Sequence, residues 1–169
     1  MRVFGAVVLV LALTSIGICK AIEFRKCLTV MHDLILMLDS VKSELCTSRT
    51  PMNRIIQRIE QNSRGEVNRF AGSLLASMDR LGEAEFSSLW RDTATDVFGV
   101  LPQDCITELS ELGTCLGRYD MDMQLEAIDR CKHKISNNID DLRPKNGKIQ
   151  KMYIGLYGGT GLIIAIMLI

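Results

Sequence analysis

The sequence predicts an all-α protein, in which a helical bundle of about six helices lies between an N-terminal and a C-terminal transmembrane helix. Apolar residues recur at steps of three and four through the middle of the chain, as on the buried face of a helix. The two ends are uncharged runs, 3–19 and 152–169. At about 1.5 Å per residue each run extends about 25 to 27 Å, close to the hydrocarbon thickness of a bilayer. The predicted domains are a first membrane helix (1–22), a helical bundle (23–150) and a second membrane helix (151–169).

Charge separates the middle of the chain from its ends. All 20 acidic residues, and all basic residues except Arg2, fall between Lys20 and Lys151. Basic residues cluster directly after the first run and directly before the second: Lys20, Arg25, Lys26, Lys145, Lys148 and Lys151. Because basic flanks tend to stay in the cytoplasm, we predict a two-span cell membrane protein with a cytoplasmic central domain. The alternative is a cleaved signal peptide, with Ser15 and Gly17 as the small residues before the cut.

The first helix of the central domain is predicted to continue the first span, since no Gly or Pro occurs between Ile18 and Thr50. Its predicted inward stripe is Phe24, Leu28, Met31, Ile35, Leu38 and Leu45. A second helix begins with Thr50 as the cap and Pro51 at the first helical position. It buries Met52, Ile55, Ile56 and Ile59 and ends at a break over 62–65.

Four further helices follow. The third ends near Leu81-Gly82, the fourth runs from about Glu83 to Gly99, the fifth begins at 101–102, and Asp120 caps the sixth. Their predicted inward residues, in chain order, are Val67, Phe70, Ala71, Leu74, Leu75 and Met78; Phe86, Leu89, Trp90, Ala94 and Val97; Ile106, Leu109, Leu112 and Leu116; and Leu125, Ile128, Ile135, Ile139, Leu142 and Ile149. Pro144 interrupts the sixth helix, which we predict to enter the membrane as one long, bent helix.

Residue types that carry chemistry are few or scattered. The sequence has no GxxxxGK[ST] phosphate loop, and His32 and His133 lie far apart along it. The cysteines form no CxxC pair, and an odd number of them falls in the central domain, which indicates reduced thiols. A net charge near zero and few aromatic residues argue against nucleic-acid binding. We therefore predict no catalytic residue, no cofactor, no metal and no small-molecule substrate.

Several motifs stand out: Arg49-Thr50-Pro51-Met52, the Trp90 helix, the stretch from Leu112-Gly113 through Leu116-Gly117 to Asp120 and Gln124, and Lys151-Met152-Tyr153 before a glycine-bearing last span. Together these motifs resemble the stage III sporulation protein AB family, and the resemblance covers essentially the whole chain. Two positions depart from the family pattern. Ser48 and Tyr157 stand where the family often has a glycine.

The resemblance implies a function that composition and periodicity do not. Such proteins belong to the channel between mother cell and forespore in endospore-forming bacteria, and their soluble domain is similar to the cytoplasmic domain of the type II secretion platform protein. We therefore expect a non-enzymatic platform subunit, required for endospore formation, in the mother cell membrane facing the forespore. Its expected partners are a cytoplasmic secretion-type ATPase, stage III sporulation protein AA, the other channel proteins, and copies of itself in a homo-oligomer. The alternative is a membrane-tethered helical signalling or dimerisation module.

The candidate partner-binding residues are Arg49, Arg54, Arg58, Gly113, Gly117, Asp120 and Gln124. The three arginines form a basic face that either docks an acidic partner or is only solvated. The two Leu-Gly steps allow close contact between proteins or, as we favour, between two helices of one bundle. In the last span, Gly155 and Gly159 stand four apart. They either pack two membrane helices together or reflect how common glycine is in such helices.

Overall fold

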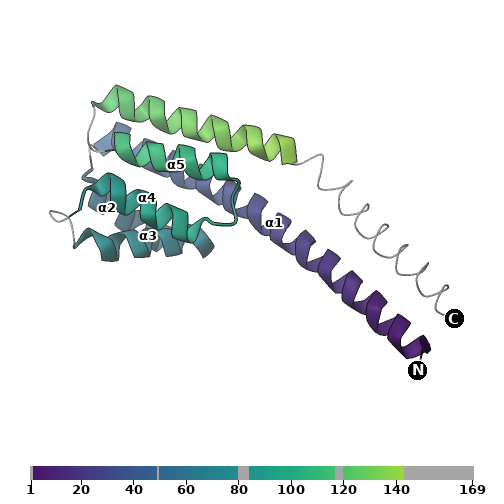
Figure 1. The fold of residues 1–169 in the computed structure, drawn as a ribbon. Helices are drawn as coiled ribbons and strands as arrows, with labels where there is room; N and C mark the ends of the chain where they lie inside the picture. Colours follow the sequence, from purple (N-terminus) through teal and green to yellow (C-terminus); the bar gives the residue numbers. More distant parts are fainter. Residues whose placement is uncertain (1, 49, 80–83, 117–119, 143–169) are drawn as a thin grey trace. The chain divides into compact units, whose positions relative to one another are not determined.

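A computed structural model describes residues 2–48, 50–79, 84–116 and 120–142, with few side chains before residue 22. The chain divides into the unit Cys27–Ile139 and a second unit, Met1–Lys26 with Asp140–Ile169. Its described residues form six helices and no strand, which confirms the predicted all-α class (Figure 1). The helices are α1 (Arg2–Ser48), α2 (Met52–Asn62), α3 (Gly65–Met78), α4 (Phe86–Val97), α5 (Gln103–Cys115) and a last helix over residues 121–142.

Of the two predicted membrane spans, the structure describes only the first. The first, 3–19, lies within α1 and has the helical backbone that the sequence predicts. The second, 152–169, lies outside the described residues, as do Pro144, Gly155 and Gly159. No helix in the described part of the chain is both long and apolar enough to cross a membrane.

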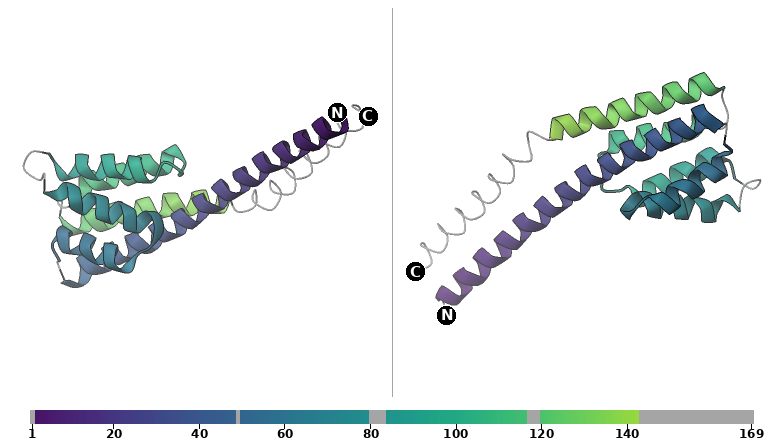
Figure 2. Two further views of the ribbon diagram at one scale, coloured as in Figure 1. Left: turned by 90° about the horizontal axis from the view of Figure 1, so that it is seen from below. Right: turned by 180° about the vertical axis from the view of Figure 1, so that it is seen from behind.

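Within the unit Cys27–Ile139, the helices pack in sequence order and each turns an apolar stripe inward. α2 packs on α3, α3 on α4, and α4 on α5. The helix over 121–142 runs antiparallel beside the second half of α1 and beside α5, as Figure 2 shows from behind. Every buried side chain in the described part of this core is apolar or a thiol. Removing such large apolar side chains from water stabilises the fold by about 1.5 to 3 kcal/mol each.

The stripe predicted for α1 is only partly right. Met31, Leu38 and Leu45 are buried as predicted, but Leu28 and Ile35 are only half-buried. The structure instead buries a second set on the same helix, namely Cys27, Val30, Leu34, Met37 and Val41. Both sets follow steps of three and four, so the sequence allows two overlapping registers. Because α1 is covered by neighbours on more than one side, the buried stripe is wider than either register alone.

The start of α2 also corrects the sequence prediction. Pro51, with φ −57° and ψ 141°, precedes the first helical residue, and its carbonyl accepts the amides of Arg54 (2.9 Å) and Ile55 (3.2 Å). Thr50 does not cap the helix, because Pro51 occupies the N-cap position and Thr50 lies one residue before it. The Thr50 hydroxyl instead donates to the Glu44 carboxylate at 3.2 Å. Pro102 begins α5 in the same way, with φ −55° and ψ 144°. Both prolines therefore lie at the cap, directly before the first helical residue, so the prediction that Pro51 is itself the first helical residue is off by one position.

The turn between α2 and α3 depends on one glycine. Gly65 has φ +62°, in the left-handed region that residues with a Cβ rarely adopt. It lies in the break predicted over 62–65, and it lets α3 begin with only two residues between the helices. Asn68 then ties the two helices together, because its side-chain amide donates to the Glu60 carbonyl at 2.6 Å.

Candidate partner-binding surface

The predicted basic face is smaller in the structure than in the sequence. Arg54 and Arg58 are exposed on α2, four residues apart and hence on one face, whereas Arg49 lies outside the described residues. Arg58 pairs with Glu44 of α1, so part of its charge is already neutralised within the bundle. Arg54 makes no ion pair with any residue that the structure describes. Among the described residues of this face, the unpaired positive charge is therefore that of Arg54.

Gly113 is buried against Trp90, which joins α4 to α5. A methyl group at Gly113 would come within 3.0 Å of three atoms of the Trp90 side chain. The indole N–H donates to the Leu109 carbonyl at 2.7 Å. In a helix that carbonyl also accepts the amide four residues on, which here belongs to Gly113. Because Gly113 has no side chain, the indole can reach the backbone of α5. Gly113 therefore allows close contact between two helices of one bundle, which is the interpretation that we favoured. Its partner step, Gly117, lies outside the described residues.

Asp120 and Gln124 mark the start of the last described helix. The helix begins at residue 121, and the Asp120 carbonyl accepts the Gln124 amide at 3.1 Å. Asp120 therefore occupies the position of an N-cap, as predicted, and its exposed carboxylate lies at the positive end of the helix dipole. Gln124 is half-buried on the next turn.

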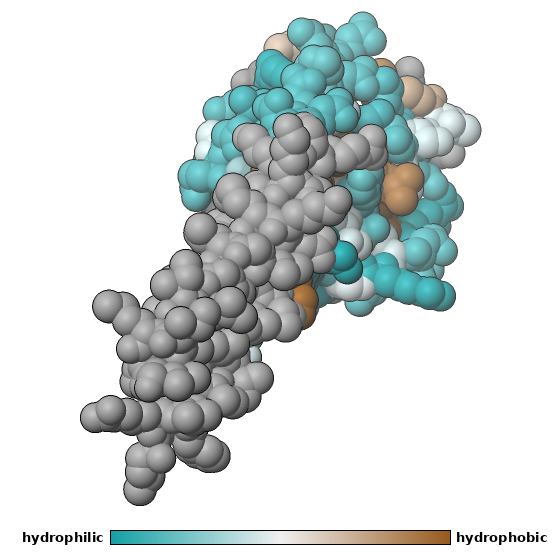
Figure 3. Space-filling view, turned by 90° about the vertical axis from the view of Figure 1, so that its right-hand side faces the viewer, coloured by the Kyte–Doolittle hydropathy of each residue, from teal (hydrophilic) through white to brown (hydrophobic). Residues whose placement is uncertain are grey.

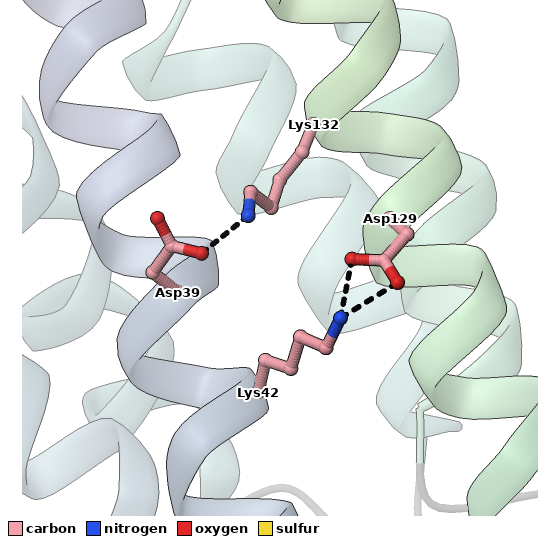
Figure 4. Close-up of polar contacts among 4 residues, drawn as sticks. All are labelled: Asp39, Lys42, Asp129 and Lys132. Atoms are coloured by element: carbon pink, nitrogen blue, oxygen red, sulfur yellow. Dashed lines mark hydrogen bonds and ion pairs between the residues drawn. The ribbon is translucent and has the colours of Figure 1, made fainter.

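Two ion pairs that we did not predict join α1 to the helix over 121–142 (Figure 4). The Lys42 ammonium contacts both carboxylate oxygens of Asp129 at 2.7 Å, and Lys132 pairs with Asp39 one turn away. The hydrogen bond to Asp129 raises the pKa of Lys42. On each helix the acid precedes the base by three residues, so the pairing works only when the helices are antiparallel. A parallel arrangement would set Asp39 against Asp129 and Lys42 against Lys132.

A second set of polar contacts joins the same last helix to α5. The Arg130 Nε lies 4.0 Å from the Glu108 Oε2, and the Lys134 Nζ lies 3.6 Å from the Asp104 Oδ2. The Asn138 amide donates to Asp104 at 3.1 Å, and this hydrogen bond lowers the pKa of the Asp104 carboxyl. Residue numbers fall along α5, from Glu108 to Asp104, as they rise along the last helix, from Arg130 to Lys134 and Asn138. The two helices are therefore antiparallel on this side as well.

The thiols of the core are chemically quiet. Cys27, Cys105 and Cys131 are buried, and burial raises the pKa of Cys105 and of Cys131 to about 12. A thiol with such a pKa is almost fully protonated at neutral pH, and the protonated form is a poor nucleophile and metal ligand. No group of three or more His, Cys, Asp or Glu residues in the described part of the chain is placed to hold a metal ion.

The described candidates do not form one site. Arg54 and Arg58 lie on α2, Gly113 is inside the α4–α5 contact, and Asp120 and Gln124 begin the last helix. On the face shown in Figure 3, the described surface is mostly hydrophilic and its apolar patches are small. The structure adds one residue that the pattern analysis missed. Leu36 is 67% exposed on α1. No signal in the sequence singles it out, because Leu34 and Met37 also lie outside the predicted stripe of that helix and are buried.

Comparison with known proteins gives one result. No curated protein and no solved structure matches the chain. The sequence model of the family described as stage III sporulation protein AB matches residues 2–169, which is nearly the whole chain. The chain therefore belongs to the stage III sporulation protein AB family, which implies a role in sporulation.

Proposed function

We propose that this chain is a non-enzymatic membrane platform subunit of the channel between mother cell and forespore. In this proposal its helical domain is cytoplasmic and couples a secretion-type ATPase, stage III sporulation protein AA, to the membrane complex. The observation that carries the proposal is the charge-paired contact between α1 and the helix over 121–142. These are the two helices whose sequences lead to the predicted spans. A partner that displaces one of them acts on a neighbour held in a defined register.

The composition of the core supports a scaffold over an enzyme. The described core holds apolar side chains and protonated thiols, and its ion pairs lie on the surface. Enzymes more often bring titratable groups into a partly buried cleft, where their pKa values are tuned for catalysis. The measurement that contradicts the scaffold proposal is ATP turnover by the pure chain.

The topology in this proposal is tested by thiol labelling of intact cells. Cys46 is exposed on α1, within the predicted cytoplasmic domain, so it is a suitable reporter. In a variant whose only cysteine is Cys46, a membrane-impermeant maleimide should react only after the cells are permeabilised. In a second variant whose only cysteine is Cys105, which is fully buried, labelling should fail in both conditions, so this variant reports folding rather than sidedness. Labelling of Cys46 in intact cells would place the domain outside the cytoplasm.

The ATPase contact is tested by copurification with charge-reversed variants. Arg54→Glu should weaken binding, since Arg54 carries the free charge of the basic face. Arg58→Glu is a less specific variant, because it also breaks the pair with Glu44. Arg91→Glu reverses an exposed arginine on α4 and serves as the matched control. Equal loss in Arg54→Glu and Arg91→Glu would indicate a general effect of charge, whereas full binding by all three variants would exclude this face.

The second candidate, a membrane-tethered helical signalling or dimerisation module, is favoured by one feature. Leu36 is a large apolar side chain that remains exposed on α1. Copurification separates the candidates, because a dimerisation module needs a second copy and no ATPase. Sporulation that survives the loss of ATPase binding would favour this second candidate.

A further inference from the structure

A groove lies between α1 and the connection from α2 to α3. It has a volume of about 340 Å³ and is lined by residues of α1, of the 62–64 connection and of the facing sides of α2 and α3. Its floor is apolar, formed by the buried side chains of Met37, Ile59 and Val67. Leu36 belongs to the same lining but stays 67% exposed, so the groove has an apolar projection at its edge.

The groove also carries two charges of opposite sign. Asp33 lies on the α1 side, and Arg64 lies at the cap of α3 on the other side. Neither of them makes an ion pair with a residue that the structure describes. The patch therefore combines an acid, a base, a projecting leucine and an apolar hollow.

We propose that this groove is the contact surface between two copies of the chain, with Leu36 of each copy entering the hollow of the other. A two-fold contact requires a self-complementary patch, in which residue i meets residue j of the partner and j meets i. Here a projection and a hollow lie side by side, and an acid and a base line the same groove. A two-fold axis pairs Asp33 of each copy with Arg64 of the other. This inference does not depend on the proposed platform function.

The groove is lined by nine residues, fewer than the roughly 20 to 30 residues per side of a standard interface, so the association is expected to be weak and transient. The wild-type full chain, purified in detergent, should show a concentration-dependent dimer in analytical ultracentrifugation. Leu36→Asp should raise its dissociation constant at least tenfold. Met123→Asp is the matched control, since Met123 is also a large exposed apolar residue but lies on the helix over 121–142. It should leave the dissociation constant unchanged.

The charge pair gives the decisive arm. Asp33→Arg and Arg64→Asp should each weaken self-association, because each variant then sets two like charges against each other across the axis. A mixture of the two single variants should associate again, since each copy meets the opposite charge at both positions. Arg64→Asp places a preferred residue at a helix cap, so loss of folding is not expected there. Circular dichroism melting of each variant confirms that the fold is kept.

Each outcome decides the proposal. Recovery in the mixture supports the two-fold contact. Weakening without recovery, a wild-type chain that stays monomeric, or dimerisation that all of these variants leave unchanged would overturn it. The last outcome would assign association to another segment, such as the predicted last span.

Discussion

The junction between α4 and α5 and the junction between α1 and the helix over 121–142 hold helices together by different physical means. At the first, a buried indole lies over a glycine, and Phe70 packs edge-on to the Trp90 ring at 4.9 Å between centroids. At the second, half-buried lysines pair with exposed aspartates at the surface, above an aliphatic core. Shape complementarity has little tolerance for change and supplies stability, whereas exposed charges add little stability but select direction and register.

The largest effect should come from removing the indole. Trp90 is 1% exposed and contacts Phe70, Phe86 and Gly113, so Trp90→Ala leaves a cavity and removes the indole hydrogen bond to the Leu109 carbonyl. The free energy of unfolding should fall by about 3 to 5 kcal/mol, measured by urea unfolding of the full chain. Trp90→Phe keeps a ring but loses the hydrogen bond and should cost less. A loss below about 1 kcal/mol for Trp90→Ala would show that the two junctions do not differ in the way described.

The next effect tests the glycine on the other side of that contact. Gly113→Ala puts a methyl group into the Trp90 ring and should lower the free energy of unfolding by about 1 to 3 kcal/mol. Gly72→Ala is the matched control, because its methyl group would meet only the flexible carboxylate end of Glu60, at 3.3 Å. Alanine favours helix over glycine, so Gly72→Ala should be neutral or slightly stabilising. Equal losses at both positions would contradict the special fit of Gly113.

A third effect appears only at alkaline pH. Burial raises the pKa of Cys131 from 9.0 to about 12, so the folded state disfavours the thiolate. Its contribution to stability is fully present below the unfolded pKa of 9.0 and is lost progressively as pH rises toward 12. Cys131→Val should therefore reduce the fall in stability between neutral pH and about pH 10, by on the order of 1 kcal/mol. Cys115→Val, at a half-buried thiol, is the control. The same slope in both variants and the wild type would rule out this source of the alkaline loss.

The smallest effect is expected at the exposed charges. Asp39→Lys should lower the free energy of unfolding by about 0.2 to 1 kcal/mol, because the side chains of the Asp39–Lys132 pair are 50% and 25% exposed. The double variant Asp39→Lys with Lys132→Asp restores the pair in reverse and should recover most of the loss. The difference should shrink as salt is added. A loss of several kcal/mol would mean that this junction, too, contributes strongly to stability.

The two junctions also differ in how far the sequence predicts them. Trp90, Leu109 and Leu112 were predicted to face inward from the periodicity of α4 and α5, and all three are buried. The close contact at Gly113 was one of two readings, and only the position of Trp90 decides between them. Local pattern is sufficient where burial alone determines which side of a helix faces inward.

Long-range contacts were harder to predict for a physical reason. Thr50 was expected to cap α2, but Pro51 occupies the N-cap position, and the Thr50 hydroxyl donates instead to Glu44 of the preceding helix. The pairing of Asp39 with Lys132 depends on which helices become neighbours, and no local propensity determines that. The matching order of acid and base on the first and last helices was present in the sequence. It is informative only once the two helices are known to be antiparallel.

The position of Trp90 has an optical consequence. It is the only tryptophan of the chain, and its indole is buried with its N–H bonded to a backbone carbonyl. Tryptophan emission therefore reports on one place in the molecule, the junction of α4 and α5, while the far-ultraviolet signal averages over all helices. Opening of that junction by a partner, a denaturant or a membrane would shift the emission to longer wavelength without a labelled probe.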